Sequence, residues 1–387
     1  MSNIETTYQE RITRIDNVLS NKLPDRVPIL STAETWQLHY AGVNLRKAFT
    51  EDADLCFKAY KKYADDIFFD AFHSIGNVCP VNFTNMLGGG MYTMTEDSLQ
   101  TSTGKAQKML GSEYADLIAD PIRFVATKII PRKFDIFNKP VDEIYDTFSA
   151  ALEEYDKFNQ LNGTVVKKVV TELGIPFISA GCCSVTVDIL EDYLRDFSGI
   201  IGDIRRHPEE VCQAGEALFD WSYRIIVAAY PNPRQGVGVM SPLHLATYLK
   251  PKDFEKFYLP YLIKMISAFT EKGYGMFLFM ENDWTPYLEM LQDLPDGKIL
   301  GLFEYGDLKK YKSSIGNKIC VAGGMPTNIL NHYSKEECIE YAKKIIDELA
   351  PGGRYIFAVD RSLLSLNDCN AENLKAVNEF VRNYARY

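Results

Sequence analysis

Residues 275–281 of the chain are GMFLFME, residues 299–304 are ILGLFE and residues 355–360 are YIFAVD. Each segment is a short apolar run that ends in a carboxylate, and each is followed by a helical pattern. A fourth apolar run, residues 318–322, leads instead into the Gly-Gly-Met-Pro sequence of residues 323–326. Apolar strands that alternate with helices are typical of a parallel sheet, and ligands bind beyond the carboxyl ends of its strands. These segments therefore predict a parallel sheet with a binding site along the edge that carries the acids.

The alternation of strands and helices extends over the rest of the chain. Further strands are expected at residues 27–30, 67–69 and 177–180, and helices at residues 192–203, 208–228 and 251–272. This repeat favours a closed (β/α)8 TIM barrel of the α/β class over an open doubly wound sheet. The glycine motifs that mark nucleotide-binding sheets do not occur. We expect a single domain over residues 1–387, with an N-terminal helical extension at residues 1–25 and an insertion at residues 100–165.

The composition narrows the class of protein. The chain has 387 residues, of which 46% are hydrophobic and 24% charged, which is typical of a globular protein. Its formal net charge of −10 disfavours nucleic acid as a partner, because phosphate binding needs a basic surface. Apolar stretches are too short to span a membrane, and the N-terminal residues lack the pattern of a signal peptide. We expect a cytoplasmic protein without a membrane partner.

The acids at the strand ends are the first candidates for chemistry. In a barrel, Glu281, Glu304 and Asp360 would point up from three strands at the face where catalytic and metal-binding residues gather. Converging carboxylates repel one another unless a cation or a proton neutralises them, so a metal site is indicated. The alternative is that each acid caps a loop or pairs with a local Lys or Arg. His244, in an apolar setting before a long helix, is the best histidine ligand candidate, and a buried core histidine is its alternative.

Other residues are candidates for contact with a substrate. Asp70 and His73 lie at the end of an early strand and either face the pocket or pack within a loop. Trp284 beside Asn282 would form an aromatic wall with a polar group, unless it is a core tryptophan. The backbone of residues 323–326 would allow a ligand to approach closely, or it simply forms a tight turn.

Several segments together resemble the uroporphyrinogen decarboxylase superfamily. They are DRVP at residues 25–28, YLRDFSG at 193–199, PEEV at 208–211, FEKFYLP at 254–260, APGGRYIF at 350–357 and ENLKAV at 372–377. The resemblance covers nearly the whole chain, and it implies a (β/α)8 barrel in agreement with the strand count.

Two activities occur in this superfamily, and the sequence favours one of them. The decarboxylase binds a polycarboxylate with arginines near its N-terminus, but residues 28–41 contain no arginine here. The other branch consists of methyltransferases that use zinc and a partner corrinoid protein. Its coenzyme-M-type members carry His-x-Cys where Phe279 and Glu281 stand here, and a further Cys near Asp360. Members acting on methoxylated aromatics have a Glu, Glu, His pattern, which Glu289 and Glu304 match while Met325 replaces the histidine.

The resemblance thus implies transfer of a methyl group from a small O- or N-methyl substrate to the cobalt of a partner corrinoid protein. Glu281 and Asp360 would bind zinc, completed by Glu304 or His244, and the metal would take the leaving oxygen. Tyr92, Trp284 and Met325 would line an apolar pocket for the methyl-bearing group.

Two other functions stay open from the sequence. One is a metal-independent lyase or decarboxylase with Glu281 or Asp70 as a general acid. The other is a non-catalytic protein that binds a tetrapyrrole or corrinoid. The sequence leaves the oligomeric state undecided.

Overall fold

Eight parallel strands form a closed barrel in the computed structural model, which describes residues 3–101 and 109–387. The strands are β1 (Ile29–Ser31), β2 (Ala71–Phe72), β5 (Ser179–Cys182), β6 (Gly238–Pro242), β7 (Gly275–Met280), β8 (Ile299–Phe303), β9 (Cys320–Met325) and β10 (Tyr355–Val359). They pair in the order β2-β1-β10-β9-β8-β7-β6-β5, and a parallel bridge between Phe72 and Phe177 closes the ring. The predicted (β/α)8 TIM barrel is confirmed. The strand expected at residues 67–69 is wrong, because β2 starts at Ala71, after the buried Phe69.

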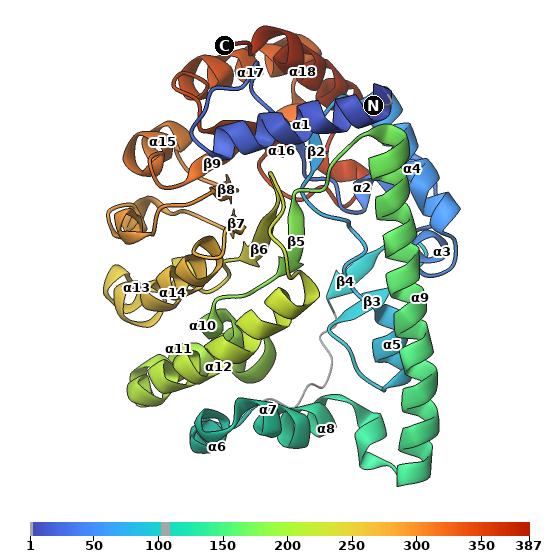
Figure 1. Cartoon of the computed structure of the whole chain (residues 1–387), viewed down its shortest axis with the longest axis vertical. Helices are drawn as coiled ribbons and strands as arrows, with labels where there is room; N and C mark the ends of the chain where they lie inside the picture. The colour runs from blue at the N-terminus through green and yellow to red at the C-terminus, as the bar shows by residue number, and fades with distance from the viewer. Residues whose placement is uncertain (1–2, 102–108) are drawn as a thin grey trace.

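Helices surround the barrel and extend to one side of it (Figure 1). The α-helices are α1 (Asn3–Leu19), α2 (Trp36–Tyr40), α3 (Leu45–Thr50), α4 (Ala53–Asp66), α5 (Val81–Met86), α6 (Tyr114–Ala119), α7 (Pro121–Phe124), α8 (Ile130–Lys133), α9 (Val141–Leu173), α10 (Thr186–Ile189), α11 (Asp196–Arg206), α12 (Pro208–Ala229), α13 (Pro251–Phe257), α14 (Leu259–Thr270), α15 (Leu308–Ile315), α16 (Thr327–His332), α17 (Lys335–Leu349) and α18 (Ala371–Tyr384). Within the described residues, no helix has both the length and the apolar character needed to cross a bilayer.

A long excursion separates β2 from β5. It contains the antiparallel pair β3 (Tyr92–Met94) and β4 (Leu99–Thr101), the short helices α6 to α8 and the 33-residue helix α9. In Figure 1, α9 runs along the side of the molecule and α6 to α8 lie at its far end. The insertion predicted at residues 100–165 falls within this excursion. Residues 102–108 of that range lie outside the described residues. The range 1–25 contains α1, with residues 1–2 likewise outside.

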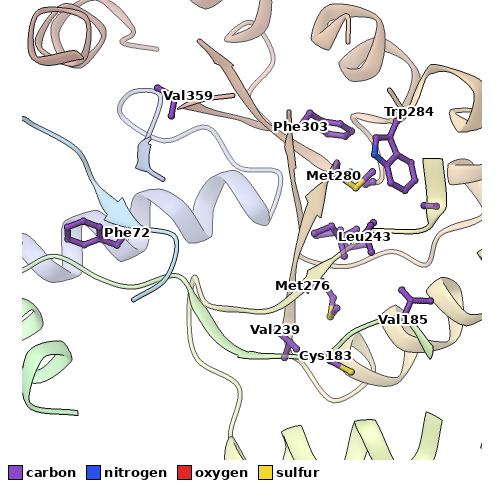
Figure 2. Packing of buried hydrophobic residues seen from close by; sticks show 14 of the residues in the cluster. Phe72, Cys183, Val185, Val239, Leu243, Met276, Met280, Trp284, Phe303 and Val359 are labelled. Carbon is purple, nitrogen blue, oxygen red and sulfur yellow. The ribbon is translucent and has the colours of Figure 1, made fainter. Parts of the chain in front are cut away.

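Alternation along the strands divides the core into an inner and an outer part. Phe277 and Phe279 of β7 point into the barrel, where they belong to one hydrophobic cluster with side chains of the other strands. Met276 and Met280 point outward to the surrounding helices (Figure 2). Ile15 of α1 packs into the inner cluster, so α1 covers the N-terminal end of the barrel. The carboxyl ends of the strands are therefore the end available for a site.

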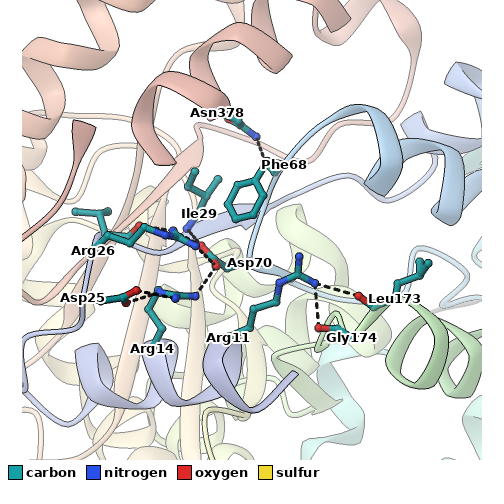
Figure 3. Close-up of polar contacts among 11 residues, drawn as sticks. Arg11, Arg14, Asp25, Arg26, Ile29, Phe68, Asp70, Leu173, Gly174 and Asn378 are labelled. Carbon is teal, nitrogen blue, oxygen red and sulfur yellow. Dashed lines mark hydrogen bonds and ion pairs between the residues drawn. The ribbon is translucent and has the colours of Figure 1, made fainter. Parts of the chain in front are cut away.

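A buried ion-pair network fastens α1 to the N-terminal end of the barrel (Figure 3). Arg26 donates to both oxygens of Asp70 at 2.8 and 2.6 Å, and Arg14 of α1 donates to it at 2.9 Å. The backbone N–H of Ile29 adds a fourth hydrogen bond at 2.8 Å. Asp70 is fully buried, and Arg14 also pairs with the exposed Asp25. This carboxylate is thus neutralised and fully hydrogen-bonded, as a buried charge must be.

Candidate active site

A histidine lies between two carboxylates at the carboxyl ends of the strands. His244 follows β6, Glu281 is the first residue after β7, and Asp192 belongs to the π-helical turn η4 (Leu190–Arg195). The Nδ1 atom of His244 lies 2.9 and 3.0 Å from the two carboxylate oxygens of Asp192, and its Nε2 atom lies 3.4 Å from Oε1 of Glu281. Each ring nitrogen thus faces an acid, which fixes the orientation of the imidazole.

The neighbouring acids decide the protonation of His244. Burial alone would lower the pKa of the imidazole, but the hydrogen bond and charge of Asp192, with the charge of Glu281, raise it to about 9. Burial raises the pKa of Glu281, and the charge of His244 offsets part of that rise. In the protein without a bound cation, His244 is therefore an imidazolium at neutral pH.

Glu191, next to Asp192, completes a set of metal donors. Glu191, Asp192 and His244 each offer one atom, and these atoms lie within 4.8 Å of one another. One buried oxygen of Glu191, Oε2, has no hydrogen-bond partner among the described residues. Burial and the charge of Asp192 raise the pKa of this carboxyl to about 7. An imidazole and two carboxylates, one with an unpaired buried oxygen, fit a divalent cation such as zinc.

Asp188 positions the segment that carries His244. It is fully buried on α10 and accepts hydrogen bonds from the Leu245 N–H at 2.9 Å and the Tyr258 hydroxyl at 2.6 Å. Burial raises the pKa of this carboxyl to about 8. Because its partner is the residue after His244, Asp188 acts on the site through the backbone.

Among the three predicted strand-end acids, Glu304 lies within electrostatic reach of both Glu281 and Asp360, and Asp360 is also held by local partners. The charge of Glu304 contributes to the raised pKa of Glu281, and burial raises the pKa of Glu304 itself. Asp360 accepts a hydrogen bond from the Thr327 N–H at 3.1 Å, at the start of α16, and lies 3.4 Å from Nε of Arg361. Asp360 thus caps a helix and pairs with a local arginine, which was the alternative for each acid.

His73 and Tyr92 lie on the β1–β2 side of the same face. His73 is buried, with Nε2 at 3.0 Å from Oε1 of Glu34 and Nδ1 at 3.3 Å from the Ser31 carbonyl. Ser362, after β10, donates to the same Glu34 oxygen at 2.8 Å. The pKa of Tyr92 is raised chiefly by burial, with a contribution from the charge of Asp192, which places the phenol within electrostatic reach of the acidic cluster.

Asp70, Trp284 and Met325 do not line a pocket at this face. Asp70 precedes β2 and lies in the arginine network at the opposite end of the barrel, because its strand runs away from it. Trp284 is fully buried beside Met280 and Phe303 (Figure 2). Its Nε1 donates to the Glu281 carbonyl at 2.9 Å, so it supports the backbone of the site rather than forming a wall. Met325 is also fully buried.

Asn282 and the glycines of β9 shape the backbone around the site. Asn282 has a φ of +60°, a left-handed conformation that Asn tolerates, and its side chain donates to the Thr247 hydroxyl at 3.2 Å. Gly323 has a φ of +118°, and a Cβ there would lie 2.9 Å from the Phe303 carbonyl. Gly323 is therefore required by packing against β8, whether or not a ligand approaches.

Sequence reasoning did not select Asp188, Glu191 or Asp192. They form the pattern D-x-x-E-D in an apolar stretch soon after β5, and this pattern was the available signal. Acids on a helical turn are usually solvated, whereas these three are buried or half-buried. Only the fold brings Asp192 to His244, which is 52 positions away in the sequence.

Comparisons with known proteins agree with this architecture. Residues 146–384 match the family model of uroporphyrinogen decarboxylase (URO-D). Two curated relatives, the uroporphyrinogen decarboxylases of Geobacter metallireducens and Geobacter sulfurreducens, are 31% and 30% identical over 117 residues, which is 30% of this chain and 33% of each relative. The chain therefore matches about a third of the length of these relatives. A solved methyltransferase from Methanosarcina mazei superimposes with a TM-score of 0.64 over 97% of this chain and 98% of its own, at 16% identity, a likeness of fold.

Proposed function

Because the chain belongs to the uroporphyrinogen decarboxylase family, we propose that it is a metal-activated methyltransferase of a corrinoid system. It would transfer a methyl group from a small O- or N-methyl substrate to a corrinoid carried by a partner protein. The observation that carries the proposal is the donor set of Glu191, Asp192 and His244, with its unpaired buried Glu191 oxygen, at the open end of the barrel. The full-length fold similarity to a methyltransferase supports the same branch.

Glu191, Asp192 and His244 are the residues that would hold zinc in this proposal. A bound zinc ion would act as a Lewis acid and stabilise the charge that develops on the leaving oxygen or nitrogen. This set replaces Glu281, Glu304 and Asp360 as the proposed ligands, because among the described residues Glu191, Asp192 and His244 are the donors grouped within 4.8 Å of one another. Asp360 is also already engaged by Thr327 and Arg361. Corrinoid transfer also requires an approach over the carboxyl ends of the strands, where the cluster lies.

Glu281 would handle the proton of the reaction. When the bond between the methyl carbon and the substrate heteroatom breaks, the heteroatom keeps the electron pair and needs a proton. Burial raises the pKa of Glu281, so its carboxyl is suited to hold and deliver that proton. Trp284 fixes the Glu281 backbone and Asp188 fixes the segment of His244, so both act as positioning residues.

Decarboxylation is the second candidate, favoured by the identity to two uroporphyrinogen decarboxylases over 117 residues. A polycarboxylate substrate would meet Glu191, Asp192, Glu281 and Glu304 at this end of the barrel, and like charges repel. Decarboxylation would proceed in chelator, whereas the proposed methyl transfer would not.

Two measurements test the proposal. Zinc affinity of chelator-stripped protein is measured by competition with a chromophoric chelator, for the wild type, Glu191→Gln and Glu304→Gln. We expect Glu191→Gln to weaken zinc binding at least about tenfold, because it removes a charged ligand, and Glu304→Gln to leave it within about twofold. Glu304→Gln is the matched control, since Glu304 is also a half-buried acid near Glu281.

Activity is then followed as methylation of free reduced cobalamin, with a panel of methoxylated and N-methylated compounds as donors. Zinc-dependent methylation with at least one donor supports the proposal, and loss of it in Glu191→Gln assigns the ligand set. Full activity in chelator, or release of carbon dioxide from uroporphyrinogen III without methyl transfer, would overturn it.

A further inference from the structure

A pocket of about 360 Å³ lies beside the acidic cluster, between the barrel and the excursion. Its walls come from the end of β5, from η4, from α12 and from the segment formed by the π-helical turn η2 (Val125–Ile129) with α8. Most lining side chains are apolar or aromatic, among them Ile129, Ile189, Leu218, Trp221 and Ile225. Its volume falls within the range of small-molecule pockets, and such pockets hold an apolar body with a few placed polar groups.

Lys133 is the cationic side chain among the residues that line this pocket. Its ammonium lies 5.8 Å from the ring centroids of both Phe134 and Tyr193, which also line the pocket. Burial lowers the pKa of Lys133, and no carboxylate of the described residues lies within ion-pair distance of it. Its neighbour Arg132, in contrast, is paired with Glu113 through two hydrogen bonds, at 2.7 and 2.5 Å.

An unpaired, half-buried ammonium in an apolar pocket is complementary to an anion. Removing a charge from water without a partner costs free energy, and a ligand carboxylate or phenolate would recover it through a charge-assisted hydrogen bond. The neighbouring acids limit the ligand to a low charge, because a second negative group would approach Asp192.

The pocket and the proposed active site share the turn η4. Ile189 and Tyr193, which line it, flank Glu191 and Asp192 on the same stretch of chain. The charge of Asp192 also contributes to the raised pKa of Tyr193, so the phenol lies within its electrostatic reach. A ligand at the Tyr193 end of the pocket would therefore lie within electrostatic reach of Asp192.

We propose that this pocket binds an apolar monoanion, whose hydrophobic body contacts α12 and η2 and whose single carboxylate or phenolate pairs with Lys133. Resting on the proposed function, this ligand is the methyl donor, with its methyl-bearing end directed along η4 towards Glu191 and Asp192. The substrate class is thus a hydrophobic compound that carries one negative charge away from the methyl group.

Binding of two matched probes to the full chain tests this pocket. The probes are 4-phenylbutanoate and its neutral amide, 4-phenylbutanamide. Binding is measured by calorimetry and by the change in tryptophan fluorescence, to which Trp221 in the pocket contributes. We expect the carboxylate to bind more tightly than the amide to the wild type. Lys133→Met should weaken the carboxylate roughly tenfold, because a charge-assisted hydrogen bond is lost, and leave the amide unchanged.

Two further variants distinguish binding in the pocket from a general effect of substitution on the protein. Lys128→Met is the matched control, since Lys128 lies on the same helical segment, is exposed and does not line the pocket. Ile225→Trp, at a half-exposed lining position, should weaken both probes by filling the space. Any of three results would overturn the proposal. They are equal binding of the carboxylate and the amide to the wild type, an unchanged affinity of Lys133→Met for the carboxylate, and no binding of either probe by the folded wild type.

Failure of the pocket proposal can be distinguished from failure of the proposed methyltransferase function. Probe binding needs no metal, so chelator-treated protein and Glu191→Gln should bind 4-phenylbutanoate as the wild type does. If the probe binds but methyl transfer is absent, the pocket stands and the methyltransferase proposal fails. If methyl transfer occurs and 4-phenylbutanoate does not compete with the donor, the assignment of the pocket to the substrate is overturned.

Discussion

Replacing Asp192 by Asn should change the protonation of His244 more than any other single substitution around it. Asp192 makes two close contacts to Nδ1 and supplies the largest of the interactions that raise the pKa of the imidazole. Asparagine keeps the shape and the hydrogen-bond acceptor but removes the charge. The perturbation therefore isolates the electrostatic contribution of one carboxylate.

The structure sets the size of the expected change. With Asp192 in place the pKa of His244 is about 9, although burial alone would lower it below its ordinary value of 6.5. Without the negative charge, burial is opposed only by the more weakly contributing Glu281 and Asp188. We expect the pKa to fall to about 6.5 or below in Asp192→Asn, and to fall less in Glu281→Gln.

Heteronuclear NMR of the imidazole nitrogens in metal-free protein measures this directly, since the chain has only 5 histidines to assign. His73 provides an internal control, because its partner is Glu34 rather than Asp192. A pKa of His244 that stays above about 8 in Asp192→Asn, or one that falls further in Glu281→Gln, would refute the reasoning.

Three further predictions concern pH, metal and stability. A pKa of His244 raised on folding stabilises the folded protein below pH 6.5, and that stabilisation is lost as the pH rises towards about 9. Urea denaturation should therefore show a steeper decline over this window in the metal-free wild type than in Asp192→Asn, in which the raised pKa values of Asp188 and Glu191 still contribute; equal slopes would contradict it. Zinc must displace the proton of His244 in order to bind. Calorimetry in buffers of different ionisation enthalpy should therefore detect proton release, and the affinity for zinc should increase from pH 7 to pH 9. An affinity for zinc that is independent of pH would contradict this. Asp70→Ala should lower the free energy of unfolding by about 3–5 kcal/mol, because the buried Arg26 loses its carboxylate partner and Arg14 keeps only Asp25. Asp25→Ala, which removes the exposed partner of Arg14, should cost less than about 1 kcal/mol; similar losses in urea denaturation would contradict the burial argument.

The strands of the second half of the barrel could be predicted because they are buried on both faces. The runs at residues 275–280, 299–303 and 355–359 are continuously apolar, and the structure has β7, β8 and β10 there. The two-residue strand β2 could not be located in this way, because the apolar Phe68 and Phe69 before it pack in the preceding segment.

The site was only partly predictable for a related physical reason. Glu281 and His244 follow strands, so their sequence positions already place them at one end of the barrel. Asp192 and Glu191 stand on a helical turn, where an acid has no preferred environment, and their burial depends on tertiary contacts. Asp70 was predicted to face the site because it adjoins a strand. It lies at the beginning of that strand, which is the opposite end from the site.

Closure of the barrel depends on pairing between elements that lie far apart in the sequence. Strand β1 pairs with β10, and Arg26 forms a backbone bridge with Arg386, 360 positions later in the sequence. The ring therefore cannot close before β10 is in place, and until then one edge of β1 and one edge of β9 have no neighbour. Unpaired edges of parallel strands with distant partners fold slowly and promote aggregation. The pairing of β10 with β1 and β9 is therefore the step that removes these two edges, and the unclosed ring is the state most prone to aggregation.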